Sequence, residues 1–70
     1  MNRRENTVIA LVMKLIIEDE RGYTSAKYLS EHITALGFKK TKQSILPYIN
    51  LMKEWGILED TDNPLNLTIL

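Results

Sequence analysis

The chain has 70 residues, of which 44% are hydrophobic, and its nine basic and nine acidic residues give a formal net charge of zero. This size and composition predict one globular domain over residues 1–70 with a single small core, and argue against disorder and against a second domain. The sequence contains no cysteine, which excludes disulfides and thiolate zinc sites, and its one histidine cannot build a metal site alone.

An apolar run from Val8 to Ile17, interrupted only by Lys14, predicts the first helix. We expect this helix to run from a cap at Asn6 or Thr7 through Glu20, because Asn and Thr side chains accept hydrogen bonds from free amides at a helix start. The run falls short of the roughly 18 apolar residues that a membrane span requires. No signal-peptide cleavage pattern follows the basic start. We therefore expect no membrane partner and a cytoplasmic location.

Apolar residues occupy nearly the whole circumference of this first helix, which exceeds the single stripe that one core-facing side usually holds. Either the helix is central in the fold, or one of its sides packs against a second subunit. We favour the second alternative and predict a homodimer whose interface contains Val8, Val12 and Ile16.

Two shorter helical patterns follow, each closed by a glycine. The spacing i, i+4, i+7 occurs in Leu29, Ile33 and Leu36 and again in Ile45, Ile49 and Met52. Gly37 and Gly56 come directly after these patterns, where a left-handed C-terminal cap is expected, and Gly22 has the same role after the first helix. Thr24 or Ser25 can cap the second helix, and the connector before it can form a short strand.

Pro47 leaves the start of the third helix open. If Thr41 caps the helix, Pro47 lies inside it, at a cost of about 3 kcal/mol or more. If Ser44 is the cap, Pro47 falls in the first turn, where its missing amide hydrogen matters little. We favour a start near Thr41 with a bend or irregularity at Pro47.

The residues after Gly56 predict a β-hairpin. Ile57-Leu58-Glu59 precedes a polar turn at residues 60–64, and residues 65–69 alternate apolar and polar side chains. The expected fold class is mainly α with a small β-hairpin. Five aromatic side chains fall at or beside apolar positions and are expected in the core: Tyr23, Tyr28, Phe38, Tyr48 and Trp55.

The segment from Thr24 to His32 resembles the second helix of winged helix-turn-helix domains in small prokaryotic and viral transcription regulators. That helix often begins with a small hydroxyl residue and carries an Ala-x-x-Leu pattern, which Ala26 and Leu29 match. Residues 45–59 are similar to the recognition helix of the family and its passage into the first strand of the wing. The resemblance covers residues 23–59 well and the rest loosely, and it departs at Pro47 and in the acidic wing turn. It implies a three-helix winged helix-turn-helix fold that inserts its third helix into the major groove of double-stranded DNA, with the wing near the backbone or a minor groove.

Several polar residues would then face DNA, since the apolar side of the third helix faces the core. Amide side chains can pair with adenine and discriminate by about 1–3 kcal/mol each, so Gln43 and Asn50 are the predicted base contacts. A lysine cluster beside a helix start opposes the positive end of the helix dipole, which indicates an external anion such as a phosphate. The predicted DNA-binding residues are Lys39, Lys40, Lys42, Gln43, Pro47 and Asn50, and Arg3, Arg4 and Lys27 are further candidates for phosphate contacts.

Two functions remain open from the sequence. The favoured one is a sequence-specific, homodimeric DNA-binding transcription regulator. The alternative is a protein-protein interaction module on the same fold, without direct DNA binding, which the zero net charge and the acidic turn favour. We expect no enzyme activity and no cofactor, because there is no glycine-rich loop and no plausible serine, histidine and acid set.

Overall fold

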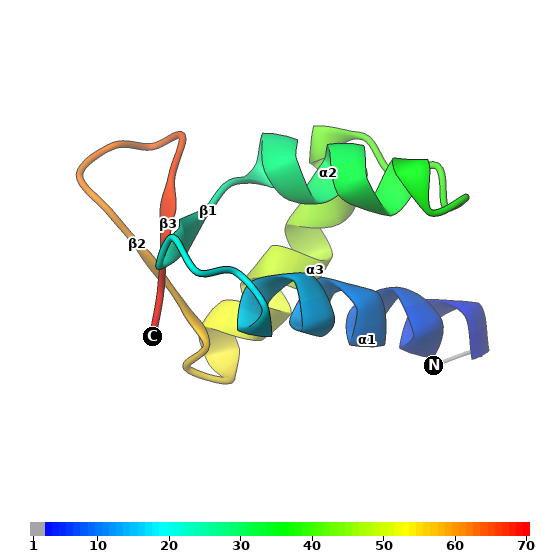
Figure 1. Ribbon diagram of the computed structural model, residues 1–70, viewed down its shortest axis with the longest axis horizontal. Coiled ribbons are helices and arrows are strands. Elements are labelled where there is room, and N and C mark those ends of the chain that lie inside the picture. The colour runs from blue at the N-terminus through cyan, green and yellow to red at the C-terminus, as the bar shows by residue number, and fades with distance from the viewer. Residues whose placement is uncertain (1–2) are drawn as a thin grey trace.

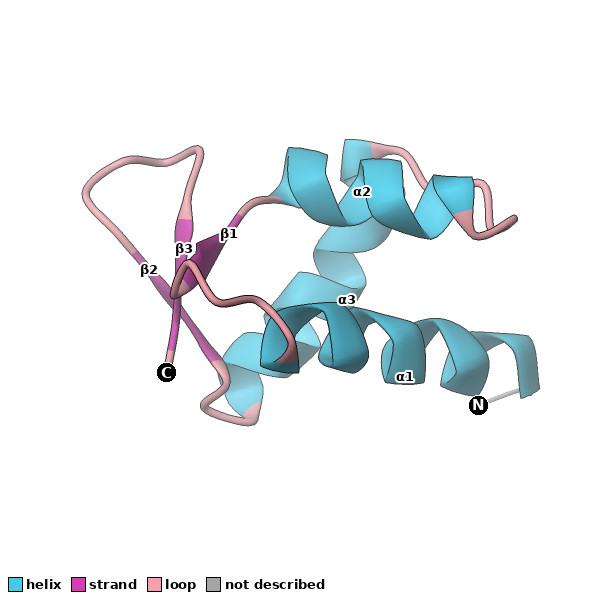
Figure 2. Ribbon diagram, in the orientation of Figure 1, coloured by secondary structure: helices cyan, strands magenta, loops and turns pink. Residues whose placement is uncertain are grey.

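The computed structural model describes residues 3–70, which form three helices and a three-stranded antiparallel sheet (Figure 1). In chain order the elements are α1 (Arg3–Ile17), β1 (Tyr23–Thr24), α2 (Ala26–Ala35), α3 (Lys42–Glu54), β2 (Leu58–Asp60) and β3 (Leu67–Ile69). The helices gather at one end of the molecule and the sheet lies at the other (Figure 2). The predicted fold class, mainly α with a small β wing, is confirmed. In residues 3–70 no helix combines the length and apolarity that crossing a membrane would need.

Helix α1 begins and ends earlier than predicted. Its helical turns start at Arg3, and the Thr7 hydroxyl donates a hydrogen bond to the Arg3 carbonyl at 2.9 Å, so Thr7 lies inside the helix and does not cap it. The helix ends at Ile17 because Asp19 forms a local turn with Arg21. The Asp19 carboxylate accepts hydrogen bonds from the Arg21 backbone amide at 2.8 Å and from its guanidinium at 2.6 Å. Such side chain to backbone bonds compete with continued helix.

Local hydrogen bonds set the starts of the other two helices. The Ser25 hydroxyl accepts the Tyr28 amide at 3.0 Å at the start of α2. At the start of α3, the Thr41 hydroxyl accepts the Ser44 amide at 3.1 Å while the Thr41 amide donates to the Ser44 hydroxyl at 2.7 Å. This reciprocal pair is a capping box, so the predicted start at Thr41 is confirmed and the alternative at Ser44 is wrong. Helix α3 continues through Pro47 to Glu54.

The core lies between the three helices and the inner face of the sheet. Its buried side chains are Val8, Val12, Ile16, Leu29, Ile33, Ile45, Ile49, Met52, Leu58 and Leu67. The predicted dimer interface of Val8, Val12 and Ile16 is wrong, because these side chains are at most 1% exposed in a single chain. They form the side of α1 that packs on α2 and α3, so a folded chain cannot offer them to a second copy.

The sheet pairs the short strand before α2 with the two strands at the C-terminal end of the chain. Strand β3 lies in the middle, with β1 and β2 on either side, and pairs Thr24 with Leu67 and Leu58 with Ile69. Two residues of the connector between α1 and α2, Tyr23–Thr24, therefore form a strand, which the sequence had left as a possibility. This pairing places the wing, residues 58–69, beside the start of α2 and the body of α3 (Figure 1).

Two of the five aromatic residues expected in the core lie at the surface instead. Tyr23 is 46% exposed and Trp55 is 51% exposed. Tyr23 points to the outer face of the sheet because its neighbour Thr24 points inward. Trp55 caps the end of α3, beyond Met52, the last residue of that helix to enter the core. The other three, Tyr28, Phe38 and Tyr48, pack partly buried against the core.

Candidate nucleic-acid interface

Helix α3 presents a polar ridge to solvent. Gln43, Pro47 and Asn50 are all exposed, and we call them the α3 ridge. They lie at the helical spacing i, i+4, i+7, on the side opposite Ile45 and Met52, which the core buries. The next residue on the same line is Glu54, which is also exposed. The ridge is therefore neutral and rich in amides along most of its length and acidic where the helix ends.

The predicted lysine cluster lies at the start of α3, but its members differ in exposure and in the contacts of their ammonium groups. Lys39 and Lys42 are exposed, and neither forms an ion pair with any residue from 3 to 70. Lys40 is half-buried, with its ammonium 5.4 Å from the centre of the Tyr48 ring. Its backbone amide donates to the Thr34 hydroxyl at 3.2 Å. Lys39 and Lys42 are thus the members most available to a phosphate.

The two N-terminal arginines lie on α1 and remain exposed. The Arg4 guanidinium lies 5.2 Å from the centre of the ring of Phe38, the residue directly before Lys39. The fold therefore brings Arg4 toward the lysine cluster, although the two are far apart in sequence.

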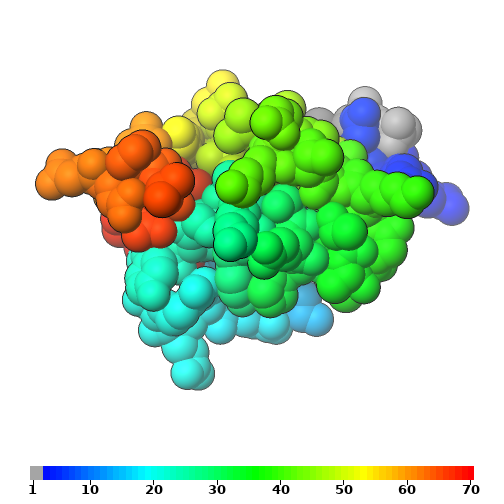
Figure 3. All heavy atoms as spheres, turned by 90° about the horizontal axis from the view of Figure 1, so that it is seen from above, coloured from blue at the N-terminus to red at the C-terminus, as the bar shows by residue number. Residues whose placement is uncertain are grey.

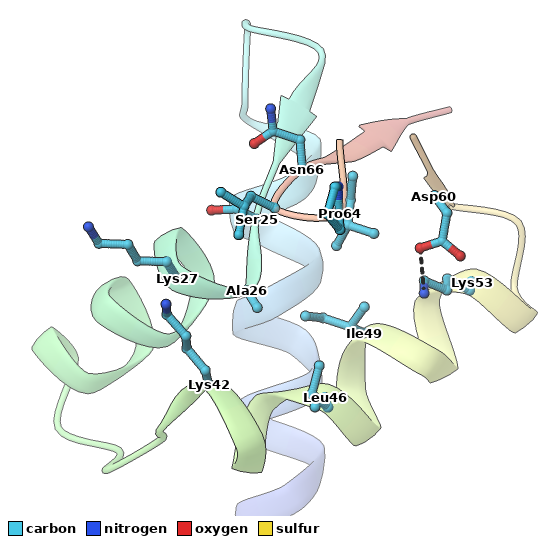
Figure 4. A pocket seen from close by; sticks show the side chains of 12 residues that line it. Ser25, Ala26, Lys27, Lys42, Leu46, Ile49, Lys53, Asp60, Pro64 and Asn66 are labelled. Carbon is cyan, nitrogen blue, oxygen red and sulfur yellow. Dashed lines mark ion pairs between the residues drawn. The ribbon is translucent and has the colours of Figure 1, made fainter. Parts of the chain in front are cut away.

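A groove of about 500 Å³ runs between the start of α2, α3 and the wing (Figure 4). Its wall is largely apolar, formed by Ala26, Leu46, Ile49, Pro64, Leu65 and Leu67. Lys27 and Lys42 extend along the same side of it, from two different helices. Neither the groove nor the approach of these two lysines was predicted. The sequence feature that could have indicated the groove is Leu46, an apolar residue outside the i, i+4, i+7 set that faces the core from its helix.

An ion pair closes the other end of the groove. The Lys53 ammonium lies 2.8 Å from an Asp60 carboxylate oxygen, which neutralises the charge of this lysine (Figure 4). The wing also carries the exposed acids Glu59 and Asp62. Negative charge thus gathers at the wing, and the free positive charge lies at the starts of α2 and α3.

Arg21 does not contribute to this positive surface. Its guanidinium is bound to Asp19 and lies 4.2 Å from the centre of the Tyr28 ring and 4.8 Å from that of Tyr23. The hydrogen bond between the two side chains lowers the pKa of Asp19 and raises the pKa of Arg21, so both stay charged. Arg21 therefore holds the turn after α1 in place.

His32 lies on α2 and packs against Tyr28. Its Nδ1 lies 2.9 Å from the Tyr28 carbonyl oxygen, and its ring stacks at 3.9 Å on the ring of Tyr28. In the part of the chain that the structure describes, no group of three or more His, Cys, Asp or Glu side chains is placed to hold a metal ion.

Comparison of the chain with protein-family models, with curated proteins and with solved structures finds no match.

Proposed function

We propose that the protein is a sequence-specific regulator of transcription that binds double-stranded DNA through the α3 ridge, in the manner of a winged helix-turn-helix domain. The observation that carries the proposal is the exposure of Gln43 and Asn50 on one side of a helix whose other side is buried. Two helical turns separate them by about 10 Å, which corresponds to about three base-pair steps. Each amide can therefore address a different base pair in the major groove. The cytoplasmic location predicted from the sequence is part of this proposal.

The free lysines support a particular path for the DNA backbone. Lys39 and Lys42 flank the start of the ridge, and Lys27 extends along the same side of the groove as Lys42. Phosphates are therefore expected over the starts of α2 and α3. The acidic wing would repel them, so we propose that the wing does not contact the backbone, unlike the wing that the resemblance implies.

Selection of bound duplexes from a random pool tests this function. Asn50→Ala should relax the base preference at one position of the selected site and leave overall affinity largely intact, because an amide that reads a base contributes to specificity more than to phosphate binding. Asn6→Ala is the matched control, since Asn6 is an exposed asparagine on another helix and should change nothing. If no duplex is bound at about 50 mM salt, the proposal is wrong.

A protein-protein interaction module is the second candidate function. The observation that favours it is a set of large apolar side chains at the surface. Leu65 and Ile17 are each 73% exposed, and Leu46 is 46% exposed. Leu46 and Leu65 line the groove, and exposed apolar side chains that gather in a groove are typical of protein contacts. A folded chain that binds no DNA but binds another protein would favour this second function.

A further inference from the structure

The groove between α2, α3 and the wing has the chemistry of a binding site for an acidic, apolar segment. Leu46 and Leu65 are exposed at its mouth. Lys27 and Lys42 extend beside them with no ion-pair partner among residues 3–70 (Figure 4). A segment that carries one apolar side chain beside carboxylates would bury the leucines and neutralise the ammonium groups together.

The chain itself presents such a segment, in the turn after α1. Ile17 is 73% exposed and is followed by Glu18 and Glu20, which are exposed and form no ion pair within the described residues. Asp19, which lies between these two glutamates, binds Arg21, which follows Glu20. This bond holds the turn in one conformation. A turn that is already ordered loses little conformational entropy when it binds.

The turn and the groove lie on different sides of the molecule. In Figure 3 the segment near residue 20, in cyan, protrudes from the lower edge, whereas α3 and the wing, in yellow and orange, lie toward the upper and left edges. The two surfaces therefore cannot meet within one chain. They can meet between two copies, each of which keeps one surface free.

We propose that the protein associates head to tail, with the turn of one copy, centred on Ile17 and Glu18, seated in the groove of the next. Because the two surfaces differ and lie on different sides of the molecule, two copies do not exchange them reciprocally. The contact is therefore heterologous and produces a ring or an open chain of more than two copies instead of a closed two-fold dimer. The zero net charge is consistent with this arrangement, since acids and bases gather on the two surfaces that meet. A docked turn also covers Lys42, so DNA and the next copy compete for this lysine.

Analytical ultracentrifugation of the unmodified chain, without DNA, gives the first test. The contact is small and such contacts bind weakly, so the measurement extends to about 1 mM protein. The average mass should rise with concentration past that of a dimer. It should fall again in about 0.5 M salt, because exposed ion pairs are screened. A chain that stays monomeric over this range overturns the proposal, and so does a mass that levels off at the dimer.

Two variants test the direction of the contact. Ile17→Asn with Glu18→Gln removes the turn surface, and Leu65→Glu places a carboxylate in the groove. All three side chains are exposed, so the fold should be kept, which circular dichroism checks. Each variant alone should be monomeric. An equimolar mixture should form dimers and nothing larger, because the intact groove of one variant takes the intact turn of the other and the remaining two surfaces are both disabled.

The matched control is Leu36→Glu, the same change at an exposed leucine that lies outside the groove. This variant should associate as the unmodified chain does. Folded variants that remain monomeric when mixed would overturn the proposal, as would association that persists in either variant alone. The experiment contains no DNA, so its outcome is independent of the function proposed above.

Discussion

Replacing Lys42 by alanine should flatten the dependence of DNA binding on salt. Lys42 is exposed in the first turn of α3, beside the ridge, and has no ion-pair partner in residues 3–70. Lys39 and Lys27 are equally free, whereas the ammonium of Lys40 lies against the Tyr48 ring. Three lysines are therefore free to contact DNA phosphates, and each such contact would release one cation bound to the DNA.

The size of the effect follows from this number. Each phosphate contact contributes about −0.9 to the slope of log affinity against log salt, so three contacts give a slope of about −2.7. Between about 50 and 200 mM salt, the affinity of the unmodified chain then falls about 40-fold. For Lys42→Ala the slope becomes about −1.8 and the fall about 12-fold. Fluorescence anisotropy with a labelled duplex of mixed sequence measures both.

Lys53→Ala is the matched control because Lys53 lies on the same helix but is already bound to Asp60 at 2.8 Å. Its removal should leave the slope unchanged. The reasoning is refuted if Lys42→Ala keeps the original slope, or if Lys53→Ala reduces it as much as Lys42→Ala does.

Three further predictions concern stability. Pro47→Ala should raise the free energy of unfolding by about 2 kcal/mol in urea titrations. It removes the cost of about 3 kcal/mol that an interior proline carries through its missing hydrogen bond and its steric clash, and it gives up about 1 kcal/mol of restriction in the unfolded chain; an unchanged midpoint would contradict this. Met52→Ala removes a fully buried side chain at a cost of about 2–5 kcal/mol, which matches the whole net stability of about 3–5 kcal/mol expected for so small a domain, so far-ultraviolet circular dichroism should show a largely unfolded chain and not a native spectrum. Asp19→Asn should lower the Tm near pH 7, and this loss should shrink as the pH falls below 3.8. The Arg21 hydrogen bond lowers the pKa of Asp19 in the folded chain, so its stabilisation is complete above the unfolded value of 3.8 and disappears as the pH falls through the folded pKa; a loss of Tm that stays the same as the pH falls would rule this out.

Much of the fold could be predicted because its determinants are local. Thr41 caps α3 through its bonds to Ser44, three residues later, and the helix continues from this cap through Pro47. The glycines after α2 and α3 have φ values of +99° and +74°, a conformation that other residues rarely adopt, so their positions alone marked the helix ends. The exposed ridge followed from the same reasoning, since helical periodicity places Gln43 and Asn50 opposite the core.

Only the tertiary structure decided which surfaces are free. Apolar residues surround α1, and periodicity could not say that Val8, Val12 and Ile16 are the ones that α2 and α3 cover. The pairing of Lys53 with Asp60 depends on the turn that carries the wing back to α3, and the approach of Lys27 to Lys42 depends on the packing of two helices. Sequence patterns report which residues share one side of one element. The charge and shape of a surface depend on how separate elements pack, which is a property of contacts between residues distant in the chain.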